Sequence, residues 1–146
     1  MSNWLYRPKV YVASKIYFHT QWKRMRESPD WSHVEFTSRW LDMAHLEDPS
    51  APQPLPADFG HFWTIDIQDV RRSDFVLLFG SDEGLKGALV ECGAALGLGK
   101  TVIVIDLPEV HSWSFHPLVV RLGTLEAARK FLRHYANLGP QWYEGK

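Results

Sequence analysis

Apolar residues gather in short runs along the chain, and the segments between these runs have helical spacing. Val10–Ala13, Phe75–Phe79 and Thr101–Ile105 are nearly continuous apolar runs, a pattern typical of strands that are buried on both faces of a parallel sheet. His33–Trp40 alternates between apolar and polar residues, and Leu118–Arg121 is a shorter apolar run. We expect each of these five segments to form a strand.

Three intervening segments have the composition of amphipathic helices. Tyr17–Arg26 stops before Pro29, and Phe62–Arg72 leads into the next apolar run. Leu125–Tyr135 follows Thr124, a residue type that commonly caps the start of a helix. The alternation of strand and helix predicts an α/β fold, an open parallel sheet with helices on both faces.

Chain length and the placement of prolines extend this picture. A chain of 146 residues fits a single domain over 1–146 with a hydrophobic core of its own. Closely spaced prolines predict a loop with polyproline character from about 48 to 58. This loop could be a lid over a site or a surface excursion.

The segment Gly87–Gly99 has the length of a helix and contains one charged residue, Glu91. Because a surface helix normally carries several polar residues, we expect this helix to be buried on most sides, against the sheet or a neighbouring subunit. A buried carboxylate needs a hydrogen-bonded partner or a function; the alternative is an exposed glutamate on a short helix. We expect Glu91 in about the first turn, where the helix dipole favours the ionised form and burial opposes it.

Ligands bind at the carboxyl ends of the strands in sheets of this type. Ser14, Lys15 and Ile16 follow the first apolar run, so we expect them at this edge, near the start of the low-charge helix. Gly84 and Gly87 would allow the backbone to approach a ligand closely. Lys15 is a candidate partner for a phosphate, or an ordinary surface charge.

Two aspartates and three tryptophans are further candidates for the same cleft. Asp66 lies in a predicted helix and could reach sugar hydroxyls or face solvent. Asp74 directly precedes an apolar run and could line the cleft or hydrogen-bond a loop. Trp22, Trp40 or Trp63 could stack on a planar ligand, or these side chains could pack in the core.

Composition excludes several classes of protein. A net charge of -1 provides no general attraction to nucleic acid or to an anionic membrane, and the apolar runs are too short to span a bilayer. The single cysteine, Cys92, and the lack of a signal-peptide pattern predict a cytoplasmic protein. Neither a dinucleotide fingerprint, a P-loop nor metal-ligand spacing is present. We therefore expect no cofactor and no metal.

A longer pattern carries a family resemblance. The string G-x-x-x-E-x-G-x-A-x-x-x-G-K is formed by Gly87, Glu91, Gly93, Ala95, Gly99 and Lys100. Asp66 and Asp74 precede it at fixed spacing, and the first strand runs into a short polar loop, VYVASKI. These features span most of residues 9–106. They resemble the nucleoside 2-deoxyribosyltransferase family, including its deoxynucleotide N-hydrolase branch.

The resemblance implies a Rossmann- or flavodoxin-like fold and a specific reaction. Glu91 would be the nucleophile that attacks the anomeric carbon of a 2-deoxynucleoside, and the glycosyl-enzyme would pass its sugar to a second base or to water. Asp66 and Asp74 would lie near the sugar or support its loop, and Ser14 and Lys15 would line the sugar or phosphate end. The implied partner is a small nucleoside or nucleotide, and the implied assembly is a homo-oligomer.

The chain departs from the family pattern in two places. Ser14-Lys15-Ile16 stands where a glycine-rich loop is common. An acidic residue often shortly precedes the catalytic glutamate, and here only Asp82 and Glu83 could take that place. A deoxynucleoside 5'-monophosphate N-hydrolase and a non-catalytic nucleotide-binding or sensing module stay as alternatives.

Overall fold

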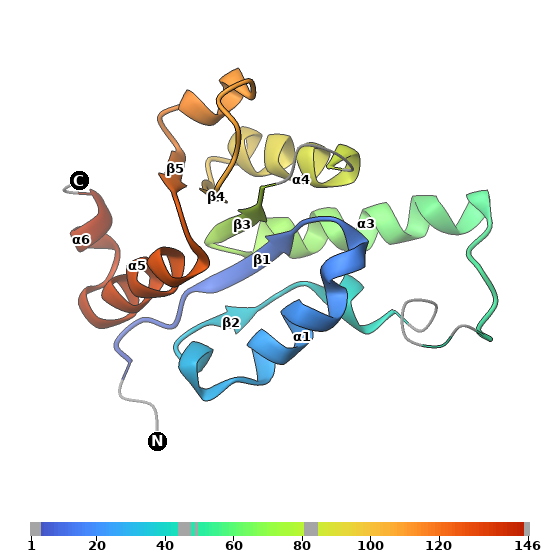
Figure 1. Ribbon diagram of the computed structural model, residues 1–146, viewed down its shortest axis with the longest axis horizontal. Coiled ribbons are helices and arrows are strands. Elements are labelled where there is room, and N and C mark those ends of the chain that lie inside the picture. Colours follow the sequence, from blue (N-terminus) through green and yellow to red (C-terminus); the bar gives the residue numbers. More distant parts are fainter. Residues whose placement is uncertain (1–3, 44–47, 49, 81–84, 145–146) are drawn as a thin grey trace.

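Five parallel strands form one sheet in the order β2-β1-β3-β4-β5 in the computed structural model, which describes residues 4–43, 48, 50–80 and 85–144 (Figure 1). The strands are β1 (Lys9–Ala13), β2 (Glu35–Phe36), β3 (Phe75–Phe79), β4 (Thr101–Ile105) and β5 (Val119–Leu122). Every residue of β4 and nearly every residue of β1 and β3 is buried, as their continuous apolar runs predict. The predicted open parallel sheet is confirmed.

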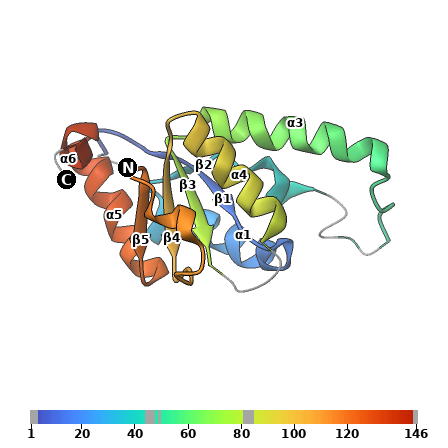
Figure 2. The ribbon, with the colours of Figure 1, turned by 90° about the horizontal axis from the view of Figure 1, so that it is seen from above.

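Helices cover both faces of this sheet, which confirms the second part of the fold prediction. Longer helices are α1 (His19–Glu27), α3 (Pro56–Arg72), α4 (Lys86–Gly97), α5 (Leu125–Leu138) and α6 (Pro140–Glu144), and single 3-10 turns are η1 (Ile16–Phe18), η2 (Pro29–Trp31), η3 (Arg39–Asp42) and η4 (Ser112–Phe115). Figures 1 and 2 show α3 and α4 on one face, and α1 and α5 on the other. Within the described ranges, no helix has the length and apolar character needed to cross a bilayer.

The strand order creates a crevice at one edge of the sheet. The chain leaves β1 toward β2 on one side and leaves β3 toward β4 on the other, so the connections after β1 and β3 diverge at the carboxyl ends of these neighbouring strands. This is the flavodoxin-like order, and the divergence point is where such sheets bind ligands. At the end of β3, a Cβ on Gly80 would lie 2.5 Å from the carbonyl oxygen of Ile105. Only glycine therefore allows the ends of β3 and β4 to pack this closely.

The second strand is much shorter than the predicted strand over 33–40. After Phe36 the backbone N–H of Thr37 still donates to the carbonyl of Val10 at 2.9 Å. The next donor on β1, the N–H of Val12, is then satisfied by the Ser38 hydroxyl at 2.7 Å. Because a side chain replaces the ladder bond, the backbone is free to leave the sheet and enter η3.

Helix α3 begins at Pro56, earlier than the predicted start at residue 62, so the end of the predicted 48–58 loop is helical. Proline is favourable in a first helical turn because its missing N–H needs no partner there, and the Asp58 carboxylate accepts from the N–H of Leu55 at 2.8 Å. With 17 residues, α3 is about 25 Å long, whereas a five-residue strand spans about 17 Å. The N-terminal half of α3 consequently projects beyond the carboxyl edge of the sheet (Figures 1 and 2).

Two helix ends follow their predicted local signals. Gly99 has a φ of 74°, and the N–H of Lys100 reaches back to the carbonyl of Ala95 at 2.8 Å, which is the expected glycine-dependent helix end. At the start of α5, the Thr124 hydroxyl accepts from the N–H of Ala127 at 3.1 Å. Helix α6 has no counterpart in the sequence predictions.

Candidate active site

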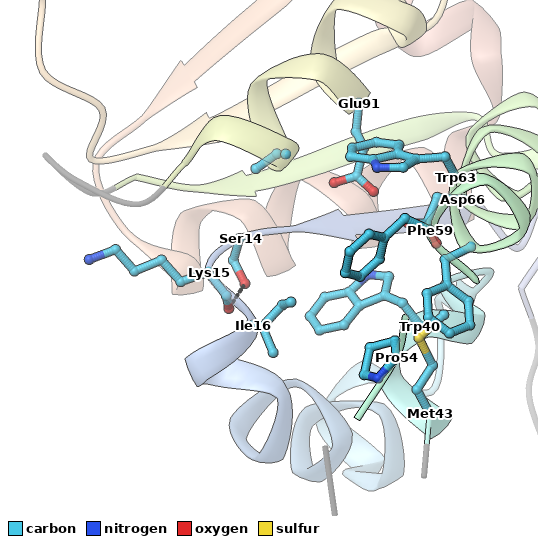
Figure 3. A pocket seen from close by; sticks show the side chains of 13 residues that line it. Ser14, Lys15, Ile16, Trp40, Met43, Pro54, Phe59, Trp63, Asp66 and Glu91 are labelled. Carbon is cyan, nitrogen blue, oxygen red and sulfur yellow. Dashed lines mark hydrogen bonds between the residues drawn. The ribbon is translucent and has the colours of Figure 1, made fainter. Parts of the chain in front are cut away.

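A cavity of about 490 Å³ opens at the carboxyl edge, among the loop after β1, η3, α3 and α4. This volume lies in the range of small-molecule sites. The lining residues are Ser14, Lys15, Ile16, Trp40, Met43, Pro54, Phe59, Phe62, Trp63, Asp66, Gly87, Ala88 and Glu91 (Figure 3). The structure thus brings together most of the predicted site residues that it describes.

Glu91 lies in the second turn of α4 and faces the cavity with 7% of its surface exposed. The hydroxyl of Tyr11, from the centre of β1, donates a hydrogen bond to Oε2 of Glu91. The helix dipole acts mainly within the first turn, and the predicted position in that turn is slightly wrong. Burial therefore outweighs the helix dipole, and it raises the pKa of Glu91 to about 8.

The rest of α4 is less enclosed than the sequence suggests. Its buried stripe consists of Ala88, Glu91, Cys92 and Ala95, whereas Val90 on another side is 56% exposed. The predicted burial on most sides is therefore wrong for a single chain. The prediction of a homo-oligomer stays a prediction.

Asp66 lines the same cavity from α3. Its Oδ1 atom is buried and has no hydrogen-bond partner among the described residues. Burial, and to a smaller extent the nearby Asp69 carboxylate, raises the pKa of Asp66 to about 6, while Arg39 opposes the increase. Two carboxyl groups with different pKa values therefore face one cavity, an arrangement characteristic of acid–base chemistry.

The loop after β1 contributes mainly structure to the lining. The Ser14 hydroxyl accepts from the indole N–H of Trp22 at 2.6 Å and donates to the carbonyl of Lys15 at 2.9 Å. The ammonium group of Lys15 extends away from Glu91 (Figure 3). Most of Ile16 is exposed. Lys15 is the one cationic residue in the described lining, and it is not aimed at the cavity.

Two predicted ligand residues lie elsewhere. Asp74 accepts from the N–H of Lys9 at 2.9 Å, at the amino ends of β1 and β3. Because this is the opposite edge of the sheet, its predicted place in the site is wrong; Asp74 instead bonds the first residue of β1, which is close to the alternative of hydrogen-bonding a loop. Trp22 is buried behind Ser14 with its ring edge on Phe79, so it supports the loop from outside the lining.

The two predicted glycines have different outcomes. Gly87 lies in the lining, and a Cβ at this position would lie 3.5 Å from Cη2 of Trp63. The Trp63 ring therefore covers the first turn of α4. Gly84, together with Asp82 and Glu83, lies outside the described residues.

Sequence reasoning missed Tyr11 and the apolar lining other than Ile16, Trp40 and Trp63. Tyr11 looks like an ordinary residue of a buried strand; the available signal is a hydroxyl inside the otherwise apolar run VYVA. Phe59, Trp63 and Asp66 follow one another at i, i+4 and i+7 on α3, which places them on one helix face. Recognising that face required the true start of the helix.

Other chemistries find little support in the described part of the chain. No three His, Cys, Asp or Glu side chains within it lie close enough together to hold a metal ion. Cys92 is buried, and burial together with the charge of Glu91 raises the pKa of its thiol. A thiol in this environment is a poor nucleophile.

Two solved structures share this fold. The CMP N-glycosidase BcmB of Clostridium botulinum is 15% identical, with a TM-score of 0.52 over 85% of this chain and 94% of that chain. A conserved protein from Enterococcus faecalis V583 is 13% identical, with a TM-score of 0.57 over 88% of this chain and 99% of that chain. No protein-family model and no curated protein sequence matches the chain. At these identities the likeness establishes the fold.

Proposed function

We propose that this protein cleaves the N-glycosidic bond of a 2-deoxynucleoside, with Glu91 as the nucleophile. The observation that carries the proposal is the buried Glu91 carboxylate facing a ligand-sized cavity that holds a second carboxyl group, Asp66. The sequence pattern around Glu91 and the fold shared with a CMP N-glycosidase support the same chemistry.

The reaction would proceed in two balanced steps. In the first, a Glu91 oxygen bonds to C1' of the sugar, the C1'–N bond breaks, and the base leaves with the electron pair and takes a proton from Asp66. In the second, water bonds to C1', its proton passes to the Asp66 carboxylate, and the Glu91–sugar bond breaks. A second base can replace water as the acceptor. A carboxylate nucleophile thus divides one difficult displacement into two easier ones.

Tyr11 supports the assignment of the two carboxyl roles. The pKa values alone, about 8 for Glu91 and about 6 for Asp66, would favour Asp66 as the ionised nucleophile. However, the Tyr11 hydroxyl donates to Glu91, and a donor stabilises the ionised form of its acceptor. Asp66 lines the same cavity, and its Oδ1 has no hydrogen-bond partner among the described residues, so we assign it the exchange of a proton with the base.

The charges around the cavity favour an uncharged substrate. Its described lining contains two carboxyl groups, and its one cation, Lys15, extends away from Glu91. A 5'-phosphate would add negative charge beside these carboxyl groups without a facing cation. A nucleoside is therefore preferred to its 5'-monophosphate in this proposal.

The test is incubation with 2-deoxynucleosides, their 5'-monophosphates and CMP, with and without adenine, followed by chromatography of the products. Wild type is expected to release free base, and transfer of the sugar to adenine identifies a second base as the acceptor. Glu91→Gln is expected to abolish release, whereas Glu109→Gln, an exposed control, retains it. Full activity of Glu91→Gln would overturn the proposal.

A non-catalytic nucleotide-binding module is the second candidate. A pKa of about 8 leaves Glu91 mostly protonated near neutral pH, and a protonated carboxyl group can donate a hydrogen bond to a ligand without reacting. Thermal stabilisation by nucleosides, with no base released from any substrate over hours, would favour this candidate.

A further inference from the structure

Asp69, one turn after Asp66 on α3, forms a clamp between this helix and the segment that leads into η3. Its side chain is fully buried. Its Oδ2 accepts from the backbone N–H of Arg39 at 2.9 Å, and its Oδ1 accepts from the Arg39 guanidinium at 2.8 Å and from Arg72 at 3.1 Å. The Thr37 hydroxyl adds a bond to the Asp69 carbonyl at 3.2 Å. Side-chain and backbone bonds together fix the two segments to each other.

The residues of the clamp adjoin two residues that line the cavity. Trp40, next to Arg39, lines the cavity and donates its indole N–H to the carbonyl of Val12 at 3.0 Å. Asp66 lies on the same helix as Asp69, three residues earlier, and also lines the cavity. The position of Asp66 relative to Trp40 is therefore set through Asp69.

The clamp also sets the charges around Asp66. Among the described residues, the charged or titratable groups near Asp66 are Asp69 on its own helix, Arg39 on η3 and Glu91 on α4, which lines the same cavity. Asp69 repels the ionised form of Asp66, and Arg39 attracts it. Removing the charge of Asp69 should thus lower the pKa of Asp66, and removing the charge of Arg39 should raise it.

The Asp69 side chain is buried, whereas the Arg39 side chain is 52% exposed. Because solvent weakens the attraction of such a half-exposed pair, stability alone is a weak explanation for this clamp. We propose that Asp69 is a positioning residue for Asp66, fixing the place of the acid group in the cavity relative to Trp40 through its bonds to Arg39. This inference rests on the proposed function, because it assumes that Asp66 exchanges a proton with the leaving base.

The test compares Asp69→Asn with Arg39→Gln, two variants that break the same pair from opposite sides. NMR titration of the aspartate side-chain carbonyl carbons in the free protein measures Asp66 without any need for activity. The Asp66 titration is expected to move to lower pH in Asp69→Asn and to higher pH in Arg39→Gln, by roughly half a unit or more. Both variants should also lower kcat by about 10- to 100-fold through misplacement of the acid.

Asp42→Asn is the matched control. Asp42 also forms an ion pair at η3, with Arg26 at 2.8 Å, but it does not line the cavity. It should leave the Asp66 titration and kcat unchanged. Unaltered Asp66 titration in both clamp variants, or shifts in the same direction, would overturn the inference. Opposite shifts without base release from any substrate would uphold the coupling and defeat the proposed function instead.

Discussion

Asp69 on α3 and Glu91 on α4 are both buried carboxylates on packed neighbouring helices of one sheet face, and their surroundings differ in kind. Asp69 accepts hydrogen bonds from two arginines and a backbone N–H. Among the described residues, the Tyr11 hydroxyl donates a hydrogen bond to Glu91, which otherwise faces a cavity. The first carboxylate has its bonding capacity filled by protein, whereas the second keeps capacity for a ligand.

The contrast shows that burial of a charge does not by itself mark a site. Burial costs free energy in both cases. At Asp69 the protein offsets this cost with partners, and at Glu91 it leaves much of the cost in place, which appears as a pKa raised to about 8. The unfilled bonding capacity beside open space is what distinguishes the candidate nucleophile.

The largest expected effect is that two isosteric variants fail in different ways, one losing activity and the other losing stability. Glu91→Gln should lower base release by about 1000-fold or more while the protein stays folded, because glutamine fills the same space. Asp69→Asn should retain much more activity but lower the free energy of unfolding by about 2 kcal/mol, since it weakens charged hydrogen bonds. Product chromatography and urea unfolding measure the two effects. Similar loss of activity in both variants would remove the distinction.

The second-largest effect concerns the pH dependence of stability, which should differ between Glu91→Gln and wild type. Because burial raises the folded-state pKa of Glu91 from 4.5 to about 8, the folded state holds its proton more tightly than the unfolded state. Stability from this group is complete below about pH 4.5 and is lost as the pH rises through about 8. Relative to wild type, Glu91→Gln should gain a few kcal/mol of stability above this window and little below it. A difference independent of pH, in denaturant unfolding, would contradict the raised pKa.

A smaller effect is expected for Asp66→Asn, about 100-fold in kcat, because Asp66 provides acid catalysis rather than the reacting bond. The reactive form needs ionised Glu91 and protonated Asp66. With pKa values of about 8 and about 6, the wild-type rate should rise to about pH 6, stay level, and fall above about pH 8. In Asp66→Asn the rate should no longer fall at high pH, because the reaction no longer needs a protonated Asp66. Rate–pH profiles check this; a loss as large as that of Glu91→Gln would reverse the two roles.

The smallest effect, about tenfold, is expected for Tyr11→Phe. Loss of a hydrogen bond to an ionised carboxylate should move the upper break of the rate–pH profile to higher pH by about one unit. The matched control is Tyr6→Phe, whose hydroxyl lies outside the site. An unchanged upper break in Tyr11→Phe would show that this bond does not support the ionised form.

Much of the fold follows from local sequence signals. The continuous apolar runs of β1, β3 and β4 can only be accommodated by a sheet covered on both faces, and Gly99 and Thr124 mark helix ends directly. The length of β2 could not be predicted, because Ser38 replaces a ladder bond with its side chain, and only the folded structure shows that geometry.

The site was predictable in part. Glu91 stands out as a lone charge in an apolar helix. Asp74 was within reach of correct placement, because a residue directly before a strand lies at the amino edge, away from the ligand edge. Tyr11 offered only its hydroxyl as a signal and Phe59 offered none, since their roles depend on which β1 side chain meets α4 and on how far α3 projects past the sheet.

The most direct test of the central claim is to identify the carboxylate that carries the sugar. Incubation with a 2-deoxy-2-fluoro nucleoside should slow breakdown of the glycosyl-enzyme, because fluorine disfavours the oxocarbenium-like transition state. Mass spectrometry of the intact protein and of its peptides then locates the adduct. We predict one fluorosugar on Glu91 in wild type and none in Glu91→Gln. An adduct on Asp66, or base release without any covalent intermediate, would contradict the assignment of Glu91 as the nucleophile.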